Sequence, residues 1–212
     1  MTIQPALAPR ELDEPLEVDP SDWSKPDVYQ LITSLVVPRP IAWISTLSPA
    51  GRRNLAPYSY FSLVADHPPH VAFSSIGEKD TLRNIRATGQ FVVNLADQGL
   101  LEQLDNSGAH FGPDQDEFLE VGVTPVPSVR VAPPRVREAK AHMECEVAGI
   151  HPVGNGNLVL GRVVHVHVEP SVWRNGRVDS TLMDPVLRLS RCYGRLSPEV
   201  TAEEEPAPHV FT

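Results

Sequence analysis

Polar side chains and a proline alternate along one predicted strand, from Asn54 to Ser59. The pair Ala56-Pro57 favours an extended backbone, and the proline removes one donor from the strand ladder. Asn54, Tyr58 and Ser59 supply an amide and two hydroxyl groups along the same strand end. Such an edge suits a flat heteroaromatic ligand with carbonyl groups and ring nitrogens. The alternative interpretation is a plain strand entrance with a proline bulge.

A second group of candidates lies at a predicted helix start and comprises Ser74, Ser75, Lys79 and Thr81. The first turn of a helix offers free backbone N–H groups and the positive end of the helix dipole. A lysine ammonium and three hydroxyl groups at this point would complete a phosphate cradle. We expect Asp80 to cap the helix. The alternative is an ordinary capped helix with Lys79 in solvent.

His165 and His167 alternate with valines, which places both imidazoles on one face of a strand. A stable metal site needs a third and usually a fourth ligand, and His142, Glu144 and His151 are the available candidates. We favour a structural or solvent-facing role for the pair and expect no metal.

The familiar catalytic signatures are absent from the sequence. There is no G-x-S-x-G elbow, no H-E-x-x-H helix, no Walker loop and no G-x-G-x-x-G turn. Serine hydrolase, zinc protease, P-loop and Rossmann functions therefore have no sequence support.

Composition and charge narrow the partners and the compartment. The 18 basic and 27 acidic residues give a net charge of −9, which argues against nucleic acid. No stretch approaches the roughly 18 consecutive apolar residues of a membrane span, and the acidic N-terminal stretch predicts no signal peptide. The two cysteines, Cys145 and Cys192, are too few for a disulfide scaffold, so we expect a cytoplasmic protein. Glu144 and Glu146 flank Cys145, which indicates an inert buried thiol.

The 22 prolines limit long helices and favour strands, turns and loops, so we expect a mainly β fold with a few short helices, closed as a barrel. We expect an extended N-terminal arm over 1–24, one domain over 25–196 and a flexible C-terminal tail over 197–212. Expected strands are 41–47, 54–64, 71–75, 91–95, 141–147, 158–168 and a hairpin about Asn175-Gly176; expected helices begin at Ser24, Asp80 and Asp97, and 108–134 is expected as loop.

Several short motifs, taken in order, resemble the flavin reductase-like family, whose fold is the FMN-binding split barrel. The resemblance runs from about Tyr29 to Tyr193, which is most of the chain. It is carried by Pro38-Arg39-Pro40-Ile41, Ser45-Thr46, Gly51, Asn54-Leu55-Ala56-Pro57-Tyr58-Ser59, Phe61, Asp66 with Pro68-Pro69, Lys79-Asp80-Thr81, Asn84-Ile85 and Phe91-Val92-Val93-Asn94-Leu95.

The resemblance implies a six-stranded split β-barrel that forms a homodimer, with FMN in a groove at the subunit interface. It implies that Ser45, Thr46 and the segment 54–59 line the flavin ring and ribityl chain. Ser74, Ser75, Lys79 and Thr81 would meet the phosphate. The family's Arg-Leu-Gly-Gly run appears here as Arg188-Leu189-Ser190-Arg191, without either glycine. Arg191 is our candidate for a flavin contact, with Arg188 as the alternative.

The resemblance implies an NAD(P)H:FMN reductase that passes a hydride from a nicotinamide to FMN and supplies a monooxygenase or another electron acceptor. An FMN-binding electron carrier of the flavoredoxin type, without nicotinamide activity of its own, is the second hypothesis. A barrel that binds another ligand or a protein partner is the third. The choice between NADH and NADPH stays open, because the sequence has no Rossmann-type discriminator.

Overall fold

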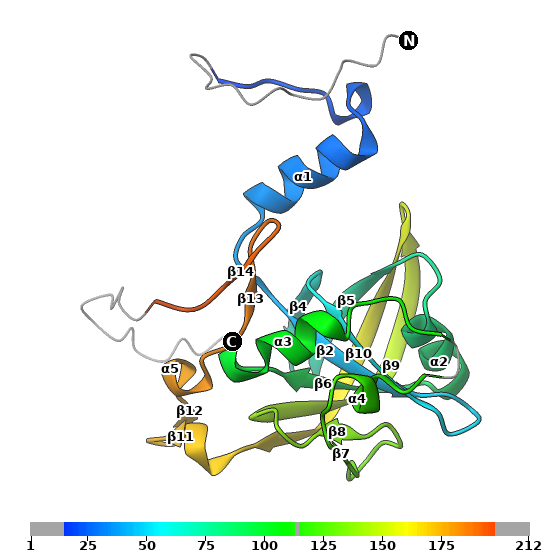
Figure 1. Ribbon diagram of the computed structural model, residues 1–212, viewed down its shortest axis with the longest axis vertical. Coiled ribbons are helices and arrows are strands. Elements are labelled where there is room, and N and C mark those ends of the chain that lie inside the picture. Colours follow the sequence, from blue (N-terminus) through cyan, green and yellow to red (C-terminus); the bar gives the residue numbers. More distant parts are fainter. Residues whose placement is uncertain (1–14, 113–114, 198–212) are drawn as a thin grey trace.

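The computed structural model describes residues 15–112 and 115–197, and seven antiparallel strands form its main sheet (Figure 1). In spatial order they are β3 (Arg53–Tyr58), β2 (Ala42–Leu47), β6 (Gln90–Leu95), β9 (Ala141–Val153), β10 (Gly156–Val168), β5 (Pro69–Ile76) and β4 (Phe61–Asp66). These strands confirm the mainly β prediction. Most of the expected arm and tail lies outside the described residues.

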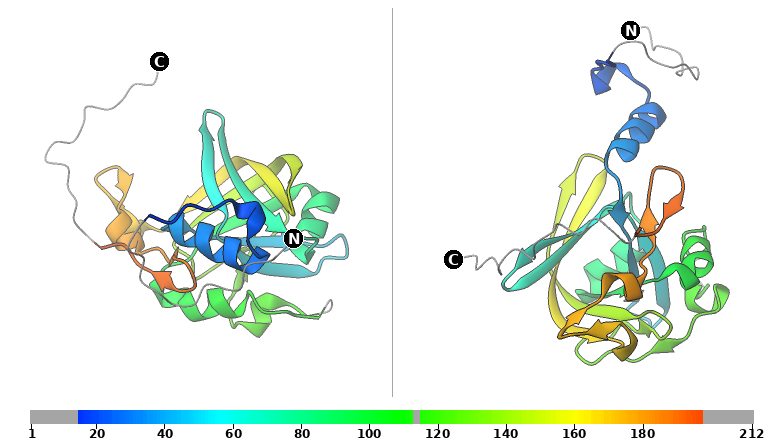
Figure 2. Two further views of the ribbon diagram at one scale, coloured as in Figure 1. Left: turned by 90° about the horizontal axis from the view of Figure 1, so that it is seen from above. Right: turned by 90° about the vertical axis from the view of Figure 1, so that its left-hand side faces the viewer.

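The sheet must curl, because its two edge strands follow each other in the chain. β3 and β4 stand at opposite ends of the strand order, yet only Ser59 and Tyr60 separate them. The backbone N–H of Ser74 on β5 donates to the carbonyl of Tyr60 at 2.9 Å, which holds this connection against the far edge. The sheet has seven strands instead of six, since the expected strand 54–64 divides at this connection. The right-hand view of Figure 2 shows the resulting barrel.

Helix α1 (Lys25–Leu35) begins where the sequence predicts. Ser24 has extended dihedrals and its side chain accepts from the N–H of Asp27, while Pro26 occupies the first turn. Figures 1 and 2 show that α1 projects away from the barrel beside the strand pair β13 (Leu187–Arg188) and β14 (Tyr193–Gly194). A hydrogen bond of 2.8 Å between Ser34 Oγ and Ser190 Oγ links the helix to the loop of that pair.

The remaining elements are short. The helix expected from Asp97 is present as η2 (Gln98–Leu100) and α3 (Leu101–Asn106), with the Asp97 side chain as its cap. The turn about Asn175-Gly176 is confirmed, because both residues have positive φ, 50° and 79°. The helices and strands not yet named are η1 (Pro20–Asp22), β1 (Arg39–Pro40), α2 (Asp80–Thr88), α4 (Glu117–Glu120), β7 (Pro125–Val126), β8 (Arg135–Val136), η3 (Pro170–Val172), β11 (Trp173–Arg174), β12 (Arg177–Val178) and α5 (Ser180–Met183).

Strand β2 is buried on both faces and so joins two apolar clusters. Ile44 points into the barrel, where it packs in one cluster with Phe73. Trp43 points to the opposite face and packs with Leu55 and Phe118 under α3 and α4. The neighbouring edge strand β3 therefore lies between the barrel and the two helices, which is where a groove opens.

Candidate functional site

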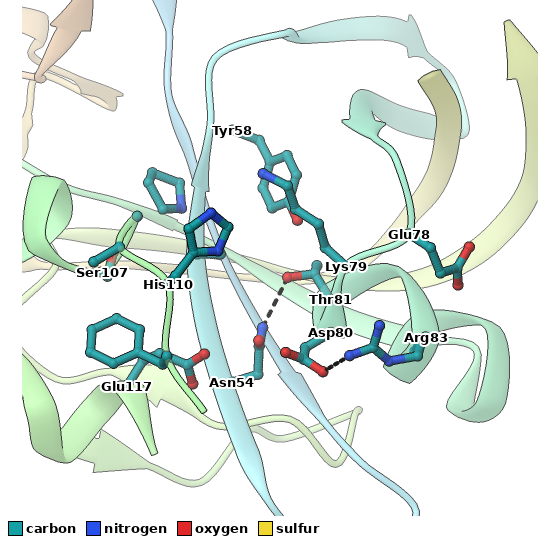
Figure 3. A pocket seen from close by; sticks show the side chains of 15 residues that line it. Asn54, Tyr58, Glu78, Lys79, Asp80, Thr81, Arg83, Ser107, His110 and Glu117 are labelled. Atoms are coloured by element: carbon teal, nitrogen blue, oxygen red, sulfur yellow. Dashed lines mark hydrogen bonds and ion pairs between the residues drawn. The ribbon is translucent and has the colours of Figure 1, made fainter. Parts of the chain in front are cut away.

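A groove of about 240 Å³ opens between the end of β3, the start of α2, the segment 107–111 and α4 (Figure 3). Its lining combines three kinds of group: a strand edge, a helix start with basic and acidic side chains, and a buried carboxyl. The lining residues are Asn54, Ala56, Pro57, Tyr58, Glu78, Lys79, Asp80, Thr81, Arg83, Ser107, Gly108, Ala109, His110, Phe111 and Glu117. Six of the residues predicted from the sequence are thus brought together.

The β3 side of the groove is rigid, because its side chains are anchored in the core. The Tyr58 ring packs on Phe73 with centroids 4.8 Å apart, and burial raises the pKa of the Tyr58 hydroxyl. Lys79 Nζ lies 6.0 Å from the centroid of the same ring. Figure 3 shows the lysine side chain extending toward Tyr58. Ala56 and Pro57, the residues before Tyr58 on the same strand, also line this side of the groove.

The start of α2 presents backbone N–H groups without a side-chain cap, contrary to our expectation that Asp80 is the cap. Lys79 takes the cap position with extended dihedrals, φ −115° and ψ 166°, and no side chain accepts from the first turn. Asp80 is the first helical residue, and its carboxylate pairs with Arg83 one turn later. The positive end of the dipole and the Lys79 ammonium therefore both face the groove. Helix α2 ends, as predicted, at Gly89 with a φ of 70°.

The segment 107–111 forms a wall that sequence reasoning missed. Trp43 Nε1 donates to Ser107 Oγ at 2.8 Å, and this hydroxyl donates to the carbonyl of Leu104 at 2.7 Å. Gly108 lies so close to β3 that a Cβ there would be 3.3 Å from Pro57 Cγ. The core tryptophan thus positions the backbone that carries His110 into the groove.

Glu117 was also missed, because we expected the whole stretch 108–134 to be loop. It opens α4 at the base of the groove, where its side chain is 8% exposed and Oε2 has no hydrogen-bond partner among the described residues. Burial raises the pKa of Glu117 to about 7, and the nearby carboxylates of Asp80 and Asp116 act in the same direction. Phe118 beside it is fully buried, and this large apolar residue is a sequence signal for a packed element that our loop prediction did not use.

Asn54 connects this carboxyl to α2. Its amide lies 2.9 Å from Thr81 Oγ1. With the amide nitrogen turned toward Glu117, the nitrogen donates to Oε1 at 3.2 Å. The amide oxygen then accepts from the hydroxyls of Thr81 and Thr46 and from the N–H of Leu55. One buried side chain thereby joins the two ends of the site.

The other predicted residues do not line the groove in this chain. Ser45 Oγ is fully buried and donates to the carbonyl of Pro134 at 2.5 Å. Thr46 lies behind the groove, where its hydroxyl accepts from Asn84 Nδ2 at 3.0 Å. Ser74 and Ser75 both lie near the end of β5, where Ser75 is fully buried and Ser74 is half-buried. Ser59 is half-buried in the β3–β4 connection. Their flavin roles stay predictions.

Arg191 lies on the exposed loop between β13 and β14. Its Nη2 donates to Gln30 Oε1 on α1 at 2.9 Å. Arg188 stacks over the Tyr193 ring at 4.5 Å. Neither side chain lines the groove, so the choice between them for a flavin contact stays open.

The imidazoles at 165 and 167 take part in a structural network. His167 Nε2 lies 2.6 Å from Glu144 Oε1, and the His165 ring packs on His167 at 4.6 Å. Within residues 15–112 and 115–197, no three His, Cys, Asp or Glu side chains are arranged to hold a metal ion. Cys145 is buried, and burial together with Glu144 raises its pKa to about 12, as expected for an inert thiol.

No helix in the described ranges is long and apolar enough to cross a membrane.

Comparisons with known proteins agree with this architecture. The family model described as "Flavin reductase like domain" matches residues 34–182. Nitrilotriacetate monooxygenase component B from Bacillus cereus has a TM-score of 0.85 and 32% identity, covering 89% of this chain and 99% of that one. The 2-nitrobenzoate 2-nitroreductase NbaA of Pseudomonas fluorescens has a TM-score of 0.82 and 30% identity, covering 93% and 98%.

The flavoredoxin of Desulfovibrio vulgaris is also similar, with a TM-score of 0.72 and 26% identity over 79% of this chain and 92% of that one. A structure with a split barrel domain from Shewanella frigidimarina has a TM-score of 0.79 and 23% identity, covering 87% of this chain and 93% of that one, and this likeness confirms the expected fold.

Proposed function

Since the chain belongs to the flavin reductase-like family, we propose that it is a flavin-dependent oxidoreductase that passes a hydride from NADH or NADPH to FMN. One observation carries this proposal: the Ala56-Pro57-Tyr58 stretch of an edge strand and an uncapped, lysine-bearing helix start line the same groove. The first suits an aromatic ring and the second a phosphate, and FMN contains both at the two ends of one molecule.

The residues present fit FMN. The free N–H groups of α2, Lys79 and Thr81 would hold the phosphate. Ala56 and Pro57 would support the ring and exclude water from one of its faces. When bound, FMN supplies the redox chemistry by accepting a hydride at N5 and passing the electrons on. The backbone amides of 54–59 are the donors that would stabilise the negative charge of the reduced ring.

A flavin-binding electron carrier without nicotinamide activity is the second candidate, favoured by the likeness to a flavoredoxin. The two functions differ in one measurement, the visible spectrum of the flavin-loaded protein before and after NADH or NADPH is added without oxygen. Rapid bleaching of the flavin bands is the expected result, and it also identifies the preferred nicotinamide. Bound flavin that stays oxidised would support the carrier. Failure to bind FMN would reject both functions.

We further propose a cytoplasmic homodimer made of one domain, 25–196, with an N-terminal arm and a C-terminal tail. The projecting helix α1 supports the dimer, because Tyr29, Ile32 and Leu35 are 57%, 45% and 69% exposed. A monooxygenase or another electron acceptor would take the electrons. The name of the Bacillus cereus relative, a monooxygenase component B, supports such a partner.

Replacing Lys79 by alanine is expected to weaken FMN binding about 10- to 100-fold, the usual effect of losing a hydrogen bond to a charged group. Riboflavin, which lacks the phosphate, should bind both proteins equally. Quenching of flavin fluorescence measures both affinities. Lys25→Ala, an exposed lysine outside the groove, is the control. An unchanged FMN affinity would contradict the phosphate assignment.

A further inference from the structure

Glu117 is a buried acid that the proposed reaction does not use. Its Oε1 faces the amide of Asn54, whereas its Oε2 is buried at the groove without a hydrogen-bond partner among the described residues. An ionised carboxylate oxygen that is buried without a partner raises the free energy of the folded protein, whereas a protonated carboxyl can act as a hydrogen-bond donor. Burial already raises the pKa of Glu117 to about 7. The side chain is therefore poised to carry a proton near neutral pH.

The charges around Glu117 do not neutralise it. Arg53, the basic side chain on the adjacent strand, pairs with Asp116 and lies over the Phe118 ring. Arg83 pairs with Asp80. The charged and titratable groups that face this region are Arg52 before β3, Arg53 and Tyr58 on β3, Glu78 and Lys79 before α2, Asp80 and Arg83 on α2, His110 in the wall segment, and Asp116 at the cap of α4.

The carboxyl lies at the end of the groove where the phosphate is expected. Asn54 links Glu117 to Thr81, which stands in the first turn of α2. An ionised Glu117 would repel a phosphate placed at this helix start, whereas a neutral Glu117 could donate its O–H to a phosphate oxygen. Binding of the phosphate therefore favours protonation of Glu117, and protonation of Glu117 favours binding of the phosphate.

We propose that Glu117 is a proton-linked contact of the flavin phosphate, so that FMN binding transfers one proton from solvent to the Glu117 carboxylate. This inference rests on the proposed function, because it assumes that the phosphate lies at the start of α2. It adds that the groove binds FMN best with Glu117 protonated, and that Glu117 sets the pH range of tight binding.

The sign of the pH effect follows from this linkage. At a pH well below 7, Glu117 is already neutral and adds no pH dependence of its own to FMN binding; what remains there is the titration of the phosphate, whose second pKa is about 6. Above about pH 7, binding must first protonate the carboxylate, so the affinity falls by up to about tenfold per pH unit. Glu117→Gln keeps the shape, offers a permanent N–H donor and cannot ionise. Above the second pKa of the phosphate, about 6, we expect its FMN affinity to be independent of pH and to exceed that of the wild type at about pH 8.

Titration calorimetry in two buffers of different ionisation enthalpy counts the protons taken up. The measurement belongs at about pH 7.5, above the second pKa of the phosphate itself, which is about 6. At this pH about three quarters of Glu117 is ionised before FMN binds, so we expect an uptake of about three quarters of a proton per FMN for the wild type. Glu120→Gln, whose carboxylate is exposed on the same helix, should give the same uptake. We expect almost none for Glu117→Gln. His110→Asn should retain the uptake, which separates the role of Glu117 from that of the imidazole that also lines the groove.

FMN binding by the wild type without proton uptake would overturn this inference and leave the proposed function intact. Uptake that persists in Glu117→Gln would also overturn it. A wild type that binds no FMN at any pH would reject the proposed function and this inference together. Because the absence of proton uptake in the wild type is enough to overturn the inference, the test stays falsifiable even where the glutamine variant does not fold.

Discussion

Replacing Glu144 by alanine is expected to lower the free energy of unfolding by about 3 kcal/mol or more, because the change leaves several donors without their acceptor. The Glu144 side chain on β9 is fully buried. Its carboxylate accepts from the N–H groups of Val129, Arg130 and Val131 at 2.8, 2.6 and 3.2 Å and lies 2.6 Å from His167 Nε2. This one side chain therefore fixes the loop before β8 to the barrel. Urea unfolding followed by fluorescence measures the loss.

Glu146→Ala on the same strand is the matched control. Glu146 pairs with Arg162 on the surface, where both side chains are about half exposed, so its removal should cost less than about 1 kcal/mol. Equal losses in the two variants would contradict the anchoring role of Glu144.

The same contacts predict the direction of a pH effect. Burial alone would raise the pKa of Glu144, but the N–H of Val129, the His167 side chain and the N–H of Arg130 outweigh it and hold the pKa below 4.5. A lowered folded-state pKa stabilises the protein above the pKa of the unfolded chain, and this stability is lost as the pH falls through the folded value. The wild type should thus lose its advantage over Glu144→Gln as the pH falls below about 4.5.

Local sequence signals predicted the strands and the main helices, but not how the sheet closes. Alternating apolar residues and β-branched residues predict the strands β2, β5, β6, β9 and β10. These signals are readable from the sequence because they involve only residues that are near each other in the chain. Nothing local shows that the chain leaves one sheet edge at Tyr58 and enters the opposite edge at Phe61, so 54–64 read as one strand. The one-residue error at the α2 cap has a similar cause: Asp80 is a good cap by type, but it pairs with Arg83 instead.

The site was predictable where its residues lie close in sequence. Asn54 and Tyr58 share a strand, and Lys79 and Thr81 share a helix start. Residue type and spacing were therefore enough to assign each pair to the predicted site. Glu117 reaches the same groove from α4 by tertiary packing, and its type predicts exposure. Ser45 was grouped with the site by resemblance, yet its hydroxyl bonds to the carbonyl of Pro134 inside the protein.

Replacing Gly161 by valine is expected to destabilise the barrel by about 3 kcal/mol, because this side chain would enter a space that Phe91 already fills. A Cβ at Gly161 on β10 would stand 2.3 Å from Phe91 Cζ and 3.3 Å from Cys145 Cβ. The Phe91 ring is fully buried and packs edge-on against Phe73 with centroids 5.5 Å apart, so it cannot move without displacing a second ring. Thermal or urea unfolding reports the loss.

Gly149→Val on the paired strand β9 separates overpacking from the general effect of a side chain on a sheet glycine. A Cβ there would meet the imidazole of His151, whose Nε2 would be 2.8 Å away and which belongs to an exposed side chain that can rotate. The φ of Gly149 is not positive, so the backbone at this position accepts a valine. We expect Gly149→Val to be close to neutral. If both valines cost the same, crowding against Phe91 is not what requires a glycine at 161, and the bulge between Leu160 and Gly161 becomes the better explanation.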